Sequence, residues 1–118
     1  MNKKVLVIDD DEGILEATQL MLEVSGYDVE TSVNGDVLKK MKMNKPDLIL
    51  LDYFLSGTDG CQIAKKLKSK EETKNIPIIM ISAHPNAKQD MEDVDINGFI
   101  PKPFDMYTLL DQIKANIN

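Results

Sequence analysis

Short apolar runs alternate along the chain with stretches that carry helical spacing. The runs at 4–8, 48–51 and 76–81 are almost unbroken, too apolar for strands with one wet face, so we expect strands buried on both faces of a parallel sheet. A weaker alternation at 27–31 predicts a partly exposed strand near the sheet edge, and 98–100 predicts a short fifth strand.

Between these runs the apolar residues recur with the spacing of amphipathic helices. They predict helices from Glu12 to Gly26, around Val37 to Met41, from about Asp59, and after a cap at Asp105. The stretch 83–94 has only a thin apolar stripe among many charges. We therefore expect the fourth helix, which falls there, to be truncated or mobile.

Strands that alternate with helices in this way predict an α/β fold. We expect a doubly wound, five-stranded parallel sheet in the order 2-1-3-4-5, a flavodoxin-like (βα)5 arrangement. In that order strands one and three are neighbours where the winding reverses, and ligands bind there, outside the carboxyl ends of the strands. Asp9 and Asp10 follow the first strand and Asp52 ends the third, so these carboxylates should lie together.

Composition narrows the class of protein. A chain of 118 residues with 42% hydrophobic content is expected to form one domain. The net charge is −6 and all 14 basic residues are lysines, which argues against direct nucleic-acid binding, since base and phosphate recognition favours arginine. The short apolar runs predict no membrane segment, and the single Cys61 excludes an intrachain disulfide. We expect a cytoplasmic protein.

The carboxylate cluster predicts metal-assisted phosphoryl chemistry. Three carboxylates at neighbouring strand ends repel one another, which raises at least one pKa unless a cation is present. Oxygen ligands suit Mg²⁺ or Mn²⁺. With such an ion a carboxylate can attack phosphorus, and Lys102 and Ser82, each at a strand end, would supply a second cation and a hydroxyl donor. We infer that Asp52 is a phosphate acceptor.

Four separated motifs make the chain resemble a receiver domain of the two-component response regulators, the CheY-like superfamily. They are Asp9-Asp10 after the first strand, Asp52 with Asp59-Gly60 following it, Ser82, and Lys102-Pro103-Phe104. The resemblance covers essentially all of residues 1–118 and implies one receiver domain, with no output domain expected.

The resemblance also implies a role for each site residue. Asp52 would be the phosphorylation site, and the backbone carbonyl of Phe54 would join Asp9, Asp10 and Asp52 around Mg²⁺. Lys102 would pair with the phosphoryl group, and the Lys102–Pro103 bond is usually cis in this family. Ser82 and Phe99 would form the switch. Phe54 and His84 occupy the positions that tune dephosphorylation, and a bulky Phe54 would hinder the attacking water. Purely structural roles remain open for two of these residues: Phe99 as a core-packing residue and His84 as a solvated loop residue.

The function implied by this resemblance is phosphoacceptor signalling. The protein would not be an enzyme, beyond catalysing its own phosphorylation and dephosphorylation. Its partners would be a sensor histidine kinase or a histidine phosphotransfer protein, with a homodimer or downstream effector on the face of helix 4, strand 5 and helix 5. Alternatives are a degenerate receiver acting as a phosphorylation-independent interaction module, or an aspartate-nucleophile phosphohydrolase, which needs an acid where Phe54 stands.

Overall fold

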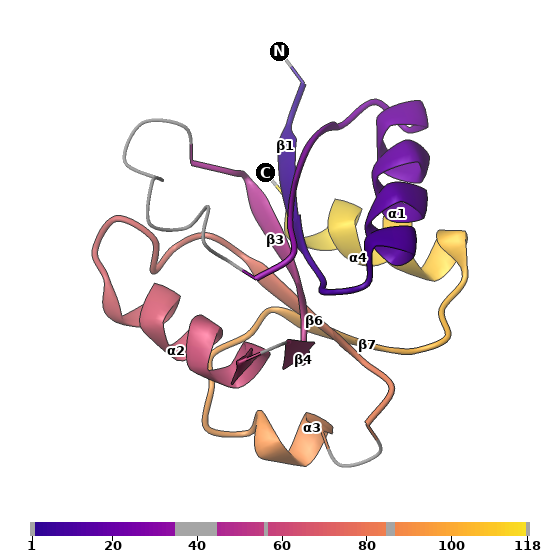
Figure 1. The fold of residues 1–118 in the computed structure, drawn as a ribbon. Helices are drawn as coiled ribbons and strands as arrows, with labels where there is room; N and C mark the ends of the chain where they lie inside the picture. Colours follow the sequence, from indigo (N-terminus) through magenta and orange to yellow (C-terminus); the bar gives the residue numbers. More distant parts are fainter. Residues whose placement is uncertain (1, 35–44, 56, 85–86, 118) are drawn as a thin grey trace.

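The predicted parallel sheet is present in the structure, a computed structural model that describes residues 2–34, 45–55, 57–84 and 87–117 (Figure 1). Within these residues five parallel strands pair in the order β2-β1-β3-β6-β7. Their bounds are Lys4–Ile8 for β1, Asp28–Ser32 for β2, Leu48–Asp52 for β3, Ile78–Ser82 for β6 and Gly98–Pro101 for β7. The predicted order 2-1-3-4-5 is confirmed, since β6 and β7 are the fourth and fifth strands of this sheet.

Four helices are described: α1 (Glu12–Val24), α2 (Gly60–Ser69), α3 (Ala87–Asp90) and α4 (Met106–Asn116). The truncation expected in the fourth predicted helix is confirmed, because α3 spans four residues. The helix predicted around Val37 to Met41 lies outside the described residues. No helix in the described ranges is both long enough and apolar enough to cross a bilayer.

Aspartates begin the three longer helices. The carboxylates of Asp11, Asp59 and Asp105 accept hydrogen bonds from main-chain amides three residues on, at 3.1, 2.9 and 2.7 Å. Each bond satisfies an amide of the first helical turn that has no partner inside its helix. Because Asp11 caps α1, the neighbouring Asp9 and Asp10 are left for the sheet edge.

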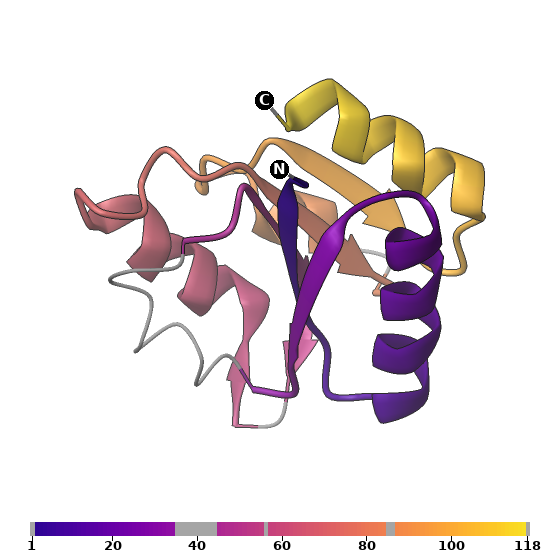
Figure 2. The same cartoon turned by 90° about the horizontal axis from the view of Figure 1, so that it is seen from above.

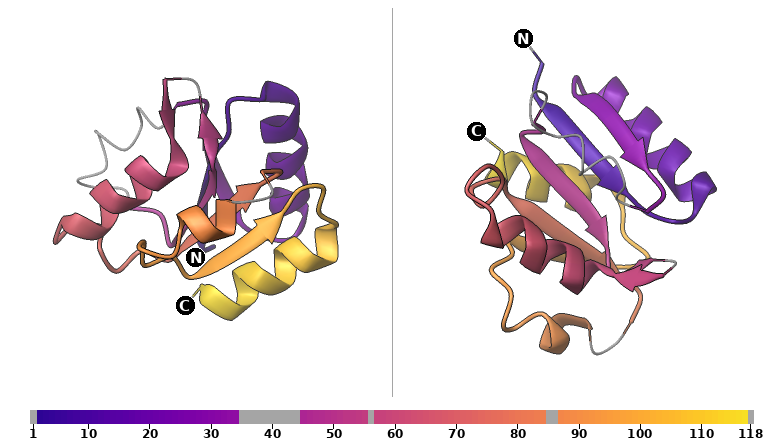
Figure 3. Two further views of the ribbon diagram at one scale, coloured as in Figure 1. Left: turned by 90° about the horizontal axis from the view of Figure 1, so that it is seen from below. Right: turned by 60° about the vertical axis from the view of Figure 1, so that its left-hand side comes forward.

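Two hydrophobic clusters sandwich the sheet. Side chains alternate along β3, so that Ile49 and Leu51 pack toward α2, while Leu48 and Leu50 pack toward α1 and α4. Figures 2 and 3 show the helices divided in this way between the two faces. All five residues of β3 are buried, as the unbroken apolar run predicts, and the strand ends in Asp52 at the carboxyl edge of the sheet.

A small antiparallel hairpin, which the sequence did not predict, follows β3. Its strands are β4 (Phe54–Leu55) and β5 (Thr58–Asp59), and Gly57 in the turn has a φ of 82°, a value that favours glycine. The hairpin folds the chain back so that the Gly60 amide donates to the Tyr53 carbonyl at 2.6 Å. Gly60 thereby comes against the backbone of Asp52.

The close approach of Gly60 generates a stability prediction. A Cβ atom at this position would lie 2.5 Å from the main-chain oxygen of Asp52, so Gly60→Ala must displace backbone at the site. We expect the free energy of unfolding, measured in urea, to fall by about 1–3 kcal/mol. The control is Gly13→Ala in the first turn of α1, where the new Cβ meets only a side-chain oxygen of Asp11 at 3.3 Å. Equal effects of the two substitutions would contradict the close approach.

Candidate functional site

Three carboxylates meet at the carboxyl edge of the sheet. Ile8 in β1 pairs with Leu51 in β3, so the residues that follow, Asp9 and Asp52, end neighbouring strands at the same level. Together with Asp10 they can present one oxygen each within 4.8 Å of one another. Asp9 and Asp52 are only 4% and 6% exposed, whereas Asp10 faces solvent. The predicted juxtaposition of these three residues is confirmed.

Hydrogen bonds fix Asp9 in this position. Its amide donates to the carbonyl of Ser32 at 3.1 Å, which continues the β1–β2 pairing by one residue. One oxygen of its carboxylate accepts the amide of Asp11 at 2.9 Å. The other oxygen is the one that faces Lys102, so the orientation of this carboxylate is set from both sides.

Lys102 reaches the carboxylates from the other half of the sheet. It follows β7, and β6 lies between β7 and β3, so its side chain spans a strand to reach the site. Its Nζ lies 3.1 Å from Oδ2 of Asp9 and 3.3 Å from Oδ2 of Asp52. Its main-chain amide donates to the Ser82 carbonyl at 2.8 Å, and the Lys102–Pro103 bond is cis, as the family resemblance implies.

The surroundings of Asp52 raise the pKa of its carboxyl from 3.8 to about 6. Burial is the largest cause, and repulsion from Asp9 adds to it, while Lys102 opposes both. Repulsion between the carboxylates, the cause expected from the sequence, is therefore a smaller contribution to the raised pKa than burial. Burial lowers the pKa of Lys102, but its hydrogen bond to Asp9 and the attraction of both carboxylates outweigh this, and the net shift is upward.

The donor set fits a hard divalent cation. Three carboxylates come together here, and the ammonium group of Lys102 contacts two of them, those of Asp9 and Asp52. All the side-chain ligands are oxygens, as Mg²⁺ and Mn²⁺ prefer. The role of the Phe54 carbonyl as a metal ligand stays a prediction, but the hairpin constrains its direction. Bonded and non-bonded pairs alternate in an antiparallel ladder, and the Gly60 amide bonds to the Tyr53 carbonyl. The next pair along, Phe54 with Asp59, is therefore of the non-bonded kind, with its carbonyls directed away from the ladder.

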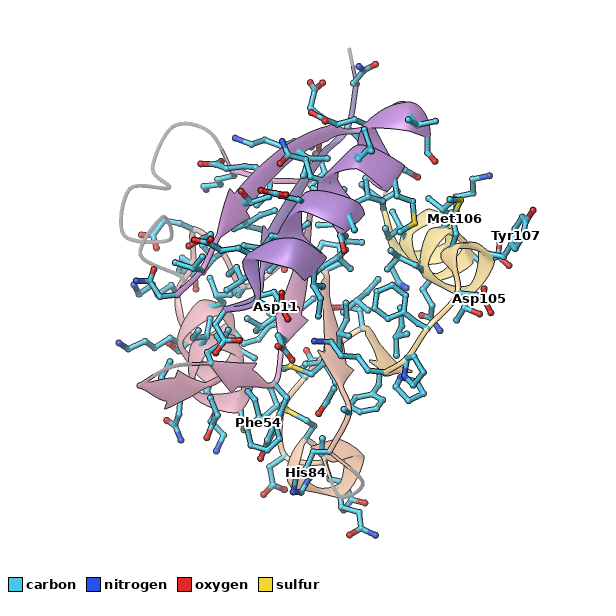
Figure 4. All side chains as sticks on the ribbon, turned by 45° about the vertical axis from the view of Figure 1, so that its right-hand side comes forward. Asp11, Phe54, His84, Asp105, Met106 and Tyr107 are labelled. Carbon is cyan, nitrogen blue, oxygen red and sulfur yellow. The ribbon has the colours of Figure 1, made fainter. Side chains whose placement is uncertain are left out.

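Aromatic rings gather beside the site, as Figure 4 shows for Phe54 and His84. The ring centroids of Phe54 and His84 are 5.2 Å apart in an edge-to-face arrangement. Tyr53 meets Phe54 edge-to-face at 5.0 Å and lies nearly parallel to His84 at 5.9 Å. We call Tyr53, Phe54 and His84 the aromatic cluster. Sequence reasoning had singled out Phe54 and His84 but not Tyr53, whose only sequence signal was its place directly after Asp52.

The two residues of the expected switch lie on neighbouring strands. Ser82 ends β6, is 1% exposed, and its hydroxyl oxygen accepts the amide of His84 at 2.9 Å. Phe99 in β7 pairs with Met80 in β6 and packs, half-buried, against the hydrophobic cluster on the α2 side of the sheet. This packing is the arrangement that the core interpretation of Phe99 describes, and its role in switching stays a prediction.

An open depression of about 640 Å³ adjoins the carboxylates, and sequence reasoning did not find it. It lies where the loop after β1 meets the loop after β2, and it is lined by Asp10, Asp11, Glu12, Gly13, Val33 and Asn34. Its acidic wall favours the approach of cations. Two loops far apart in the sequence form it, so no local pattern could have indicated it.

Comparison with known proteins matches the chain to one family model, that of the response regulator receiver domain, over residues 5–114. The chain is 37% identical over 118 residues to the alkaline phosphatase synthesis transcriptional regulatory protein PhoP of Bacillus subtilis. The matched region covers 98% of this chain and 48% of PhoP. The chain spans about half the length of the curated relatives it matches.

Solved structures give the same picture. The chemotaxis protein CheY4 of Vibrio cholerae superposes with a TM-score of 0.90 at 29% identity, covering 99% of this chain and 100% of that one. The response regulator TrrA of Thermotoga maritima, solved in complex with Mg²⁺ and beryllium fluoride, superposes with a TM-score of 0.88 at 28% identity, covering 98% and 99% of the two chains.

The raised pKa of Asp52 predicts a particular pH dependence of stability. Between pH 3.8 and about 6 the folded protein holds a proton on Asp52 that the unfolded chain releases, so this group makes the fold less stable as the pH rises through that window. Asp52→Asn should therefore raise the free energy of unfolding, measured without divalent cations, most strongly above pH 6, and the gain should shrink as the pH falls toward 3.8.

The matched control for this measurement is Asp111→Asn, at an exposed position of α4, which should show no comparable gain. A gain from Asp52→Asn that stays the same across the window would mean that the Asp52 carboxyl is not perturbed by its burial.

Proposed function

The chain belongs to the response regulator receiver family, and on this basis we propose that it accepts a phosphoryl group on Asp52. The donor is the phosphohistidine of a sensor histidine kinase or of a histidine phosphotransfer protein. The observation that carries the proposal is the cluster at the sheet edge, where Asp52 ends a buried strand beside Asp9, Asp10 and Lys102. As a proposal, residues 1–118 are one receiver domain that works in the cytoplasm.

The transfer step can be assigned to these residues. A carboxylate oxygen of Asp52 forms a bond to phosphorus, the bond from phosphorus to the imidazole nitrogen breaks, and the imidazole takes up a proton as it leaves. Asp9, Asp10, Asp52 and the backbone carbonyl of Phe54 would hold Mg²⁺ or Mn²⁺, which supplies positive charge against the phosphoryl oxygens. With a pKa of about 6, Asp52 is mostly ionised at neutral pH and is able to attack.

Phosphorylation of Asp52 changes which groups of the site need partners. Once Asp52 carries the phosphoryl group, its carboxylate is no longer ionised, and the negative charge of the site lies on the phosphoryl oxygens that came with the group. Lys102, now beside Asp52 and Asp9, can pair with those oxygens. The Ser82 hydroxyl is the neutral donor at the neighbouring strand end. We propose that its movement toward the phosphoryl group biases Phe99 inward, a population shift that phosphorylation drives through its new contacts.

The proposed output surface is the face formed by α3, β7 and α4. Met106 and Tyr107 at the start of α4 are 47% and 79% exposed. They lie on a different part of the molecular surface from Phe54 and His84 (Figure 4). Apolar side chains this exposed favour contact with a second copy or an effector protein. Because α3 is short, most of this surface comes from β7 and α4.

Incubation with Mg²⁺ and acetyl phosphate, followed by intact mass spectrometry, tests the phosphoacceptor proposal. We expect a single phosphoryl adduct on the wild type and on the control Asp111→Asn, and none on Asp52→Asn. Light scattering on the phosphorylated sample then reports whether it dimerises. An unmodified wild type that still binds Mg²⁺ would favour the phosphorylation-independent interaction module.

The position of Phe54 predicts a long phosphoryl lifetime. We propose that its ring, which is 52% exposed and follows Asp52 by two residues, would hinder the water molecule that attacks the phosphoryl group. Phe54→Asn should shorten the half-life of labelled phosphoprotein by about tenfold, the factor that corresponds to roughly 1.4 kcal/mol of barrier. The control is Leu20→Ala, at an exposed position of α1. Equal lifetimes for wild type and Phe54→Asn would remove the hindrance argument.

A further inference from the structure

The hydroxyl of Ser82 is engaged by the loop that follows it. The amide of His84 donates to Ser82 Oγ at 2.9 Å, a side-chain to backbone bond across two residues that fixes the side-chain rotamer of the serine. Ser82 is 1% exposed, so water cannot easily replace this bond. Any displacement of Ser82 toward Asp52 must break the bond or carry the backbone of His84 along.

The backbone of His84 is in turn held by its ring. The imidazole packs edge-to-face on Phe54 at 5.2 Å and nearly parallel to Tyr53 at 5.9 Å, and such aromatic pairs favour defined geometries beyond simple burial. Tyr53 is itself fixed, because its amide donates to the Ile81 carbonyl at 2.9 Å. Tyr53 and Phe54 therefore contact the ring of His84, and the amide of the same His84 bonds to the hydroxyl of Ser82.

We propose that the aromatic cluster restrains the switch: by packing on His84, Phe54 and Tyr53 keep the His84 amide on the Ser82 hydroxyl and favour the unphosphorylated arrangement. This inference rests on the proposed function. Phe54 and His84 are then positioning residues that act through Ser82. The effect differs from hindrance of water, because a restraint changes the equilibrium affinity of the site for a phosphoryl group even where no hydrolysis occurs.

Beryllium fluoride with Mg²⁺ separates the two effects, since it occupies a phosphoryl site reversibly and is not hydrolysed; the relative TrrA was solved with this pair. Calorimetric titration of Phe54→Ala should give an affinity about three- to tenfold higher than that of the wild type, the range expected for loss of one aromatic pair. The substitution keeps the backbone carbonyl of residue 54, so the metal ligand is unchanged.

Three further variants distinguish positioning from a general structural effect. Phe54→Tyr keeps the ring and should restore the wild-type affinity. His84→Ala keeps the amide but loses the ring, so it should act in the same direction as Phe54→Ala, and the double variant should gain no more than His84→Ala alone. Val24→Ala, at an 81% exposed position of α1, should leave the affinity unchanged.

Hydrogen exchange gives a second readout in the phosphoryl-free protein. The His84 amide should exchange faster in Phe54→Ala than in the wild type, while the amide of Thr108, which donates to Asp105 on α4 at 2.7 Å, should exchange at the same rate in both. The His84 amide reports on the stability of the loop after β6, and the Thr108 amide reports on a helix cap outside that loop.

The possible outcomes distinguish failure of the proposed restraint from failure of the proposed phosphoacceptor function. Unchanged or weaker binding by Phe54→Ala, or a double variant whose effects add, would overturn the restraint while leaving Asp52 as acceptor. A wild type that binds no beryllium fluoride in the presence of Mg²⁺ would overturn the proposed function, and the restraint with it. Tighter binding by both single variants, without additivity and with rescue by Phe54→Tyr, is the result we expect.

Discussion

Burial of ionisable carboxylates at the end of an apolar sheet is the constraint on which the site depends. Asp9 and Asp52 are nearly inaccessible, and a buried carboxylate loses hydration that only charge and hydrogen bonds can replace. Lys102 supplies part of that compensation from across β6. The ionised form of Asp52 remains incompletely compensated, and its pKa is therefore raised. A ligand that brings positive charge stabilises that ionised form.

The fold supplies this constraint because its central strands have no polar face. Every residue of β3 is buried, and its side chains alternate between two hydrophobic clusters. A strand of this kind cannot slip in register without moving Asp52 relative to Asp9, since the residues directly before them, Leu51 and Ile8, pair with one another. The packing of the sheet thus sets the spacing of the carboxylates, and the loops add the remaining groups.

The sheet and the carboxylate cluster could be predicted from the sequence, whereas the hairpin and the aromatic contacts could not. The apolar runs 4–8 and 48–51, with acids directly after them, indicated the carboxylate cluster. The alternation of strands with helices indicated the sheet order through the winding rule of such folds. The hairpin β4–β5 was missed, since two-residue strands have no period to detect. The contact of Tyr53 with His84 was also missed, because those residues follow different strands, β3 and β6, and meet only once the fold exists.

The brevity of α3 has a consequence for the rate of conformational change. A helix of four residues is a single turn, too short to be stable by its own hydrogen bonds, so its shape depends on the side chains that anchor it. Those that follow it, Met91 and Val94, belong to the same cluster on which Phe99 packs. Rearrangement of this segment then requires no cooperative helix melting, and its kinetic barrier is that of repacking a few apolar side chains.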